Sequence, residues 1–123
     1  MFLLLVMLGG ALGSGARYLV ARATTHLFGL GFPYGTLSVN ILGGLAMGLL
    51  VGTLARSGGG EPWRLFLGVG VLGGFTTFSS FSLDVVVLYQ RGAVALAAGY
   101  LAISVVGSIA ALAAGLAMTR AAA

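Results

Sequence analysis

The chain has 123 residues, of which 59% are hydrophobic and 7% charged, and its formal net charge is +4. A soluble domain carries about 25% charged residues, so this chain could not cover a globular surface and is expected to lie in a membrane. With no cysteine, one histidine and two acidic residues, it offers no disulfide and little for acid–base or metal catalysis, so we do not expect an enzyme. The positive charge comes from six scattered arginines, which argues against nucleic-acid binding.

Four apolar segments run along the chain, each close to the roughly 20 residues that cross a bilayer as a helix. Their expected bounds are residues 2–21, 34–54, 63–89 and 93–118. The first loop is expected to begin at Thr24, Thr25 and His26, and the glycine-rich residues 56–62 form the clearest linker. The segments predict an all-α integral membrane protein, in which residues 1–123 form a single multi-pass domain of four transmembrane helices in the lipid bilayer.

The arginines give little information on the direction in which the chain inserts. Four spans would place both chain ends and the 56–62 linker on one side of the membrane. That side carries Arg56, Arg64 and Arg120. The opposite side carries Arg22 and Arg91, with Arg17 about one turn inside the first segment. Because an excess of lysine and arginine on one side sets orientation, this near balance predicts dual topology, in which copies insert both ways and pair antiparallel.

Several glycines recur at four-residue spacing, which places them on one face of a helix. Such stripes of small residues let membrane helices approach closely. The stripes are Gly9 and Gly13, Gly44, Gly48 and Gly52, and Gly70 and Gly74. We expect most of the 22 glycines to pack helices, and we treat only Gly73 and Gly74 as candidates for another role.

The stretch from Gly73 to Ser82 is a poor sequence for a helix that faces lipid. Its ten residues are two glycines, two threonines, three serines and three phenylalanines. Glycine and β-branched threonine disfavour a helix interior, and hydroxyls in hydrocarbon need partners. We therefore predict that the third transmembrane helix is broken at its middle and that this stretch carries the function. Such a break exposes backbone carbonyls, which can coordinate a cation such as Na⁺.

Two polar side chains at membrane depth each admit two interpretations. Arg17 continues the Gly9–Gly13 stripe and so faces protein; its guanidinium either reaches back toward the membrane surface or draws anions inward. Asn40 lies about a turn and a half into the second segment, where its amide either bonds a neighbouring helix or donates to a permeating ion. For Asn40 we favour the second interpretation.

Aligned hydroxyls and aromatic rings indicate a polar track through the protein. Hydroxyls at every fourth position share one face of the fourth segment, at Tyr100, Ser104 and Ser108. In the third segment Phe75, Phe78 and Phe81 share a stripe and interleave with hydroxyls. Aromatic rings have positive edges, so ring edges with hydroxyl and amide donors suit a small anion, whereas carboxylates would suit a cation. These features predict an anion-conducting track without identifying the anion.

Three motifs in this order resemble the Fluc family of fluoride channels, known in genomes as CrcB. The motifs are residues 9–18 in the first segment, residues 35–40 with Gly43 and Gly44 in the second, and residues 73–82 in the third. The resemblance implies an antiparallel, dual-topology homodimer with two fluoride pores in a bacterial or archaeal plasma membrane. It further implies passive efflux of fluoride, which reduces fluoride toxicity in the cytoplasm.

The resemblance also implies roles for individual residues. Phe78 and Phe81 would form the aromatic box that contacts fluoride, and Asn40 would be the pore amide. The other implied pore residues are Ser80 in the third segment, Tyr100, Ser104 and Ser108 in the fourth, and Arg17 near the pore vestibule. The backbone carbonyls of Gly73 and Thr76 would hold a structural Na⁺ on the two-fold axis. One departure from the family pattern is Gly44, which stands where a serine is more usual.

Two other classes of protein compete with the channel. Small proton-coupled multidrug exporters are also short, four-helix and sometimes dual-topology, but they need a carboxylate inside the membrane. The first segment has none, Asp84 lies toward the end of the third, and Glu61 lies in a linker. The second alternative is a non-conducting assembly protein, in which the hydroxyls only join helices; it predicts no selective flux.

Overall fold

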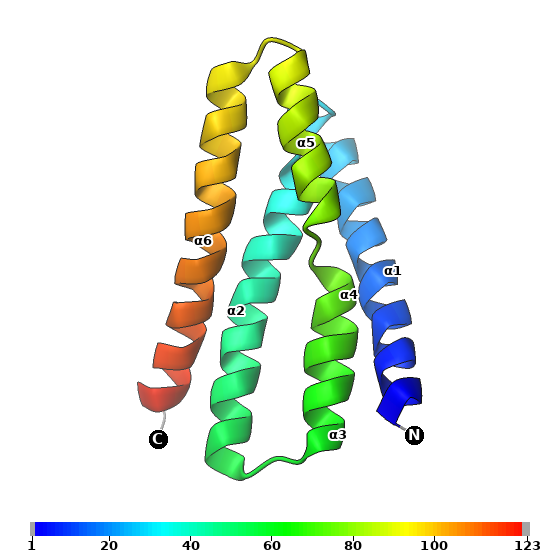
Figure 1. Cartoon of the computed structure of the whole chain (residues 1–123), viewed down its shortest axis with the longest axis vertical. Helices are drawn as coiled ribbons and strands as arrows, with labels where there is room; N and C mark the ends of the chain where they lie inside the picture. Colours follow the sequence, from blue (N-terminus) through cyan, green and yellow to red (C-terminus); the bar gives the residue numbers. More distant parts are fainter. Residues whose placement is uncertain (1, 122–123) are drawn as a thin grey trace.

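The computed structural model describes residues 2–121, and its elements are all helical. Four helices within these residues are long and apolar enough to cross a membrane: Phe2–Phe28, Tyr34–Ser57, Glu61–Gln90 and Val94–Ala121. The first, second and fourth are α1, α2 and α6. Figure 1 places both chain ends and the α2–α3 connection at one end of the molecule, opposite the turn between α5 and α6. The prediction of an all-helical chain with four membrane-length helices is confirmed.

Helix α1 is longer than expected, because it continues through the residues that were to begin the first loop. Thr24 and its neighbours stay helical up to Phe28. The Thr24 hydroxyl donates to the carbonyl of Val20 at 2.9 Å, which satisfies a polar side chain without breaking the helix. The helix ends instead at Gly29, whose φ of 79° suits glycine and few other residues. The expected loop start at residues 24–26 is therefore wrong.

The remaining helix bounds lie within three residues of the expected ones. Helix α2 runs three residues beyond the expected end, to Ser57, and stops at the left-handed Gly58. The next helix begins at Glu61, so the connection is shorter than the 56–62 linker. Its first turn carries an exposed ion pair, in which Arg64 donates to Glu61 at 2.7 Å. Such exposed pairs add little stability.

The third membrane-length helix is built from four pieces. They are α3 (Glu61–Trp63), η1 (Arg64–Leu72), α4 (Gly73–Phe75) and α5 (Ser79–Gln90). The piece η1 is a π-helix, a wider coil that the sequence pattern did not predict. Residues 76–78 lie outside any helix, and Thr76 is extended, with φ −84° and ψ 159°. The connection between α4 and α5 is visible in Figure 1. The predicted break therefore lies within the predicted stretch.

The glycine stripes pack the helices in two pairs. Helix α1 packs along η1 and α4, and α2 packs along α6. A Cβ added to Gly74 would lie 2.6 Å from the carbonyl oxygen of Gly10, and one on Gly44 would lie 2.6 Å from that of Ser108. Gly48 faces the carbonyl of Leu112 even more closely. The stripes therefore allow backbone-to-backbone contact, as their spacing predicted.

Few large side chains are buried within the single chain. A small cluster between α5 and α6 contains Phe81, Leu88, Ala97 and Tyr100. Many leucines, isoleucines and valines along all four helices are exposed instead. Outward apolar side chains are expected where lipid, or another helix, replaces water as the surroundings.

Candidate functional site

The break in the third helix is held by the amide of Asn40 on α2. Its Nδ2 donates to the carbonyl of Thr77 at 3.0 Å, and its Oδ1 accepts from the backbone N–H of Thr77 at 2.9 Å. Both backbone groups of Thr77 have left the helix, and the side-chain amide supplies what the helix would have supplied. Asn40 therefore bonds a neighbouring helix and still has one amide hydrogen for another acceptor.

Helix α1 holds the other side of the break through Arg17. Its Nε donates to the carbonyl of Gly74 at 3.1 Å. Arg17 thus faces protein, as its place on the Gly9–Gly13 stripe predicted. The carbonyl of Leu72 accepts from both the N–H and the hydroxyl of Thr76, each at 3.0 Å.

The break removes the helical hydrogen-bond donors from the carbonyls of Gly73 and Thr76. The N–H of Thr77, which would bond Gly73 in a continuous helix, turns to Asn40 instead. The N–H of Ser80, which would bond Thr76, turns to the hydroxyl of Thr77 at 3.2 Å. Within residues 2–121, no donor reaches either carbonyl oxygen. Two backbone oxygens are thereby left open beside the groove described next.

A groove between α2, the broken helix and α6 collects most of the predicted pore residues. Its volume is ≈ 520 Å³. Five of the predicted side chains line it: Asn40, Phe78, Phe81, Ser104 and Ser108. Gly73 and Thr76, the two residues with open carbonyls, line it too. Among its lining residues there is no carboxylate in the part of the chain that the structure describes. The groove therefore presents hydroxyl, amide and aromatic groups.

The two serines of the groove are the clearest sign that something polar belongs there. The hydroxyl oxygens of Ser104 and Ser108 are buried, and neither finds a hydrogen-bond partner among residues 2–121. Leaving a buried polar group unpaired costs about 1–3 kcal/mol. One turn apart on α6, they provide two donors for a water molecule or an anion.

The aromatic residues differ strongly in exposure. Phe78 is 78% exposed, whereas Phe81 is 7% exposed, and their ring centroids lie 5.7 Å apart. Phe81 in turn lies 5.3 Å from the ring of Tyr100. Phe75 does not line the groove; its ring lies near Gly43 of α2. The rings of Phe78 and Phe81 thus form one aromatic wall of the groove, and Phe75 packs elsewhere.

Three predicted site residues lie outside the groove: Arg17, Ser80 and Tyr100. Tyr100 is fully buried, and its hydroxyl donates to Oδ2 of Asp84 at 3.0 Å. The sequence alone predicted no partner for Asp84. A position three residues after Phe81 shares its helix face, and that spacing was the signal that could have pointed Asp84 toward Tyr100.

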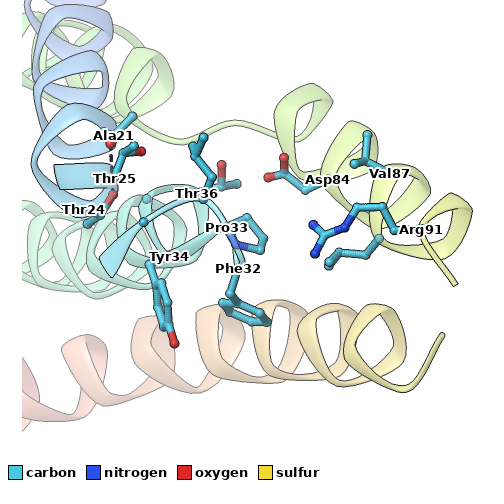
Figure 2. A pocket seen from close by; sticks show the side chains of 14 residues that line it. Ala21, Thr24, Thr25, Phe32, Pro33, Tyr34, Thr36, Asp84, Val87 and Arg91 are labelled. Atoms are coloured by element: carbon cyan, nitrogen blue, oxygen red, sulfur yellow. Dashed lines mark hydrogen bonds between the residues drawn. The ribbon is translucent and has the colours of Figure 1, made fainter. Parts of the chain in front are cut away.

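Asp84 also lines a second hollow, of ≈ 230 Å³, where the ends of α1 and α5 meet the start of α2. Figure 2 shows the Asp84 carboxylate of α5 and the guanidinium of Arg91, in the turn after α5, pointing into it, with Thr36 on another wall. The hydroxyls of Thr24 and Thr25 come from α1. Through the Tyr100–Asp84 hydrogen bond, polar groups continue from the aromatic wall of the groove to this hollow.

A family model described as CrcB-like protein, Camphor Resistance (CrcB), matches residues 4–116. The chain belongs to this family. It is 60% identical over 116 residues to the fluoride-specific ion channel FluC of Sphingopyxis alaskensis, covering 94% of this chain and 92% of that protein. It is 55% identical over 120 residues to the FluC of Caulobacter sp. strain K31, covering 96% and 94%. With four apolar helices of membrane length, it is a multi-pass membrane protein with bacterial relatives.

Proposed function

We propose that this chain forms a fluoride-selective channel for the passive efflux of fluoride. The observation that carries the proposal is the groove that is lined by two unpaired serine hydroxyls, the Asn40 amide, and the rings of Phe78 and Phe81. Relatives up to 60% identical are named fluoride-specific ion channels. The serine hydroxyls, the amide and the two rings also supply the interactions that the proposal assigns to fluoride binding.

Fluoride is small and strongly hydrated, so a selective pore must replace its water shell with strong donors. Ser104, Ser108 and the second amide hydrogen of Asn40 are donors, and the positive ring edges of Phe78 and Phe81 add electrostatic attraction. Tyr100, Ser80 and Arg17 would belong to the approaches rather than to the groove itself. A lining without a carboxylate, over the described residues, is also what an anion needs.

The open carbonyls of Gly73 and Thr76 support a structural Na⁺ at the break. Hard cations bind oxygen ligands, and unwound carbonyls in broken membrane helices serve this purpose elsewhere. These two oxygens fit the role because neighbouring donors turn away from them, to Asn40 and to the Thr77 hydroxyl. A bound cation would supply positive charge that lowers the cost of an anion at mid-membrane.

Two copies of the chain, inserted in opposite directions, would complete the channel. The exposed ring of Phe78 supports this arrangement, because an aromatic wall open on one side is covered when a second helix bundle packs against it. The near balance of arginines between the two ends supports insertion both ways. Two copies would then give two grooves, and their two breaks would supply four open carbonyls around one Na⁺.

Passive efflux follows from the chemistry of hydrogen fluoride. The neutral acid crosses membranes and dissociates in a near-neutral cytoplasm, and the membrane potential drives the trapped anion out through a channel. The competing proton-coupled exporter has no support from the named relatives. Asp84, the carboxylate on α5, accepts a hydrogen bond from Tyr100 away from the groove.

Reconstitution into liposomes tests the proposed function. Vesicles loaded with potassium fluoride or potassium chloride receive a potassium ionophore, and electrodes specific for each anion record its release. The protein should release fluoride rapidly and chloride very little, while empty vesicles release neither. Correctly folded protein that passes no fluoride, or equal amounts of both anions, would overturn the assignment.

A further inference from the structure

Arg17 supplies a hydrogen bond that the broken helix does not make for itself. In a continuous helix, the carbonyl of Gly74 would accept from the backbone N–H four residues later, at Phe78. The extended Thr76 directs the chain away before that turn can close. The Nε of Arg17 takes the place of that donor, at 3.1 Å from the Gly74 oxygen. The donor is charged and sits at a helix C-terminus, where a cation interacts favourably with the helix dipole.

The packing of α1 fixes where the arginine stem begins. A Cβ on Gly13, one turn before Arg17, would lie 2.9 Å from the backbone nitrogen of Phe75. A Cβ on Gly74 would lie 2.6 Å from the Gly10 oxygen. Because both contacts are between backbones, α1 cannot slide along α4 without a clash. The half-buried Arg17 is thus aimed at one carbonyl from a rigid helix rather than from a loop.

Arg17 and Asn40 hold the break from two different helices. Arg17 of α1 engages Gly74, and Asn40 of α2 engages Thr77, one on each side of the extended Thr76. Neither side chain reaches the carbonyls of Gly73, Phe75 and Thr76, and of these three residues Gly73 and Thr76 line the groove. The two side chains therefore hold the backbone before and after Thr76, and with it the direction of the open carbonyls.

We propose that Arg17 is a positioning residue, which fixes the end of α4 and thereby the orientation of the open carbonyls, rather than a residue that acts by attracting fluoride. The effect on flux rests on the proposed function, but the effect on the shape of the break does not. A positioning role depends on the donor at Nε. An attracting role depends only on positive charge near the pore entrance, which salt screens.

Hydrogen–deuterium exchange of the peptide spanning residues 73–78, measured in lipid nanodiscs, tests the role directly. Arg17→Met keeps the stem but removes the donor and the charge, and Arg17→Lys keeps the charge but places a methylene where Nε lies. Loss of a hydrogen bond to a charged donor corresponds to about tenfold faster exchange or more, and we expect this in both variants. Arg22→Lys, an exposed arginine on the same helix, is the matched control and should exchange like the wild type.

Flux measurements separate positioning from attraction. We expect both Arg17 variants to carry less fluoride than the wild type at all ionic strengths and to need more Na⁺ for half of their own maximal flux, because the open carbonyls lose their fixed orientation. Wild-type exchange in both variants would overturn the proposal. So would wild-type flux in Arg17→Lys combined with a loss in Arg17→Met that depends on ionic strength. If the wild type itself carries no fluoride, the proposed function fails, and the exchange rates still decide the role of Arg17.

Discussion

The side chain of Asn40 reconciles the two interpretations that its position in the sequence left open. Its carbonyl and one amide hydrogen bind the backbone of Thr77, which is the interhelical bond. A primary amide has a second hydrogen, and Asn40 lines the groove. The same residue can therefore fix the break and donate to an anion. Its hydrogen bonds to Thr77 fix the plane of the amide and so the direction of the second N–H.

Asn40→Asp should abolish fluoride flux. An ionised carboxylate cannot donate to the Thr77 carbonyl, which then loses its partner at a cost of about 1–3 kcal/mol, and its charge repels an anion. Flux in liposomes measures the loss, and size-exclusion chromatography should show an assembly of unchanged size. Wild-type flux in a correctly assembled variant would remove Asn40 from the pore.

Phe78→Ile should lower fluoride flux at least about tenfold, which corresponds to about 1.4 kcal/mol. Isoleucine fills much of the same volume but has no ring, so the groove loses the positive ring edge that the proposal assigns to Phe78. Phe2→Ile, another exposed phenylalanine on a distant part of α1, serves as the control and should conduct normally. Equal flux in the two variants would show that the ring of Phe78 takes no part in conduction.

At the scale of elements, the glycine stripes decide how closely the helices approach. Both α2 and α6 contribute glycines to their contact. Gly44 and Gly48 of α2 lie against carbonyls of α6. On α6, a Cβ added to Gly115 would lie 2.6 Å from the carbonyl oxygen of Leu45. Close backbone contact brings Ser104 and Ser108 to the same groove as Asn40. The glycine contacts therefore determine both how closely α2 and α6 pack and which polar side chains meet in the groove.

Gly48→Ala should destabilise the protein by about 1–3 kcal/mol, because a methyl group has no space against the Leu112 carbonyl. Gly15→Ala is the matched control: nothing lies within 4 Å of its added Cβ, so alanine there should be neutral or stabilise by up to about 1 kcal/mol. Thermal unfolding in detergent, followed by the fluorescence of Trp63, compares the two. A smaller loss in Gly48→Ala than in Gly15→Ala would contradict the packing argument.

The elements also show where prediction from sequence succeeds and where it stops. Apolar length, glycine spacing and the composition of the 73–82 stretch depend on local chemistry, so the four helices, the stripes and the break were predictable. The end of α1 was not, because the hydroxyl of Thr24 found a carbonyl of its own helix. Neither the π-helix nor the Tyr100–Asp84 bond was predicted. The bond joins side chains of two separate helices, and local sequence does not determine how those helices meet.

At the scale of the whole molecule, the two ends of the bundle carry similar positive charge. Arg56, Arg64 and Arg120 lie at the end of α2, the start of η1 and the end of α6, whereas Arg22 lies toward the end of α1 and Arg91 directly after α5. Figure 1 places the first three of these helix ends beside the two termini and the other two toward the opposite end. The exposed apolar side chains continue along all four helices. Nothing in the charge of the chain thus favours one insertion direction strongly.

Reporter fusions at the carboxyl terminus test dual topology. A reporter active only in the cytoplasm and one active only outside it should both give signal, in roughly equal amounts. Adding three lysines to the connection at residues 58–60 should bias the population toward one direction and thereby lower flux, because antiparallel pairs become scarce. If the unmodified chain gives signal from one reporter alone, the antiparallel dimer is excluded.

The two side chains that hold the break have a further consequence, which concerns the order of synthesis. Both Arg17 and Asn40 precede residues 73–82 in the chain, and a chain is made from its amino terminus. Helices α1 and α2 are therefore already present when the glycine- and hydroxyl-rich stretch leaves the ribosome. That stretch is the least suited to hydrocarbon, and it can bond to Arg17 and Asn40 as soon as it enters the membrane, before α6 has been synthesised. Moving α1 to the carboxyl terminus by circular permutation would remove this advantage while keeping the packing of α1 on η1 and α4 in the finished fold.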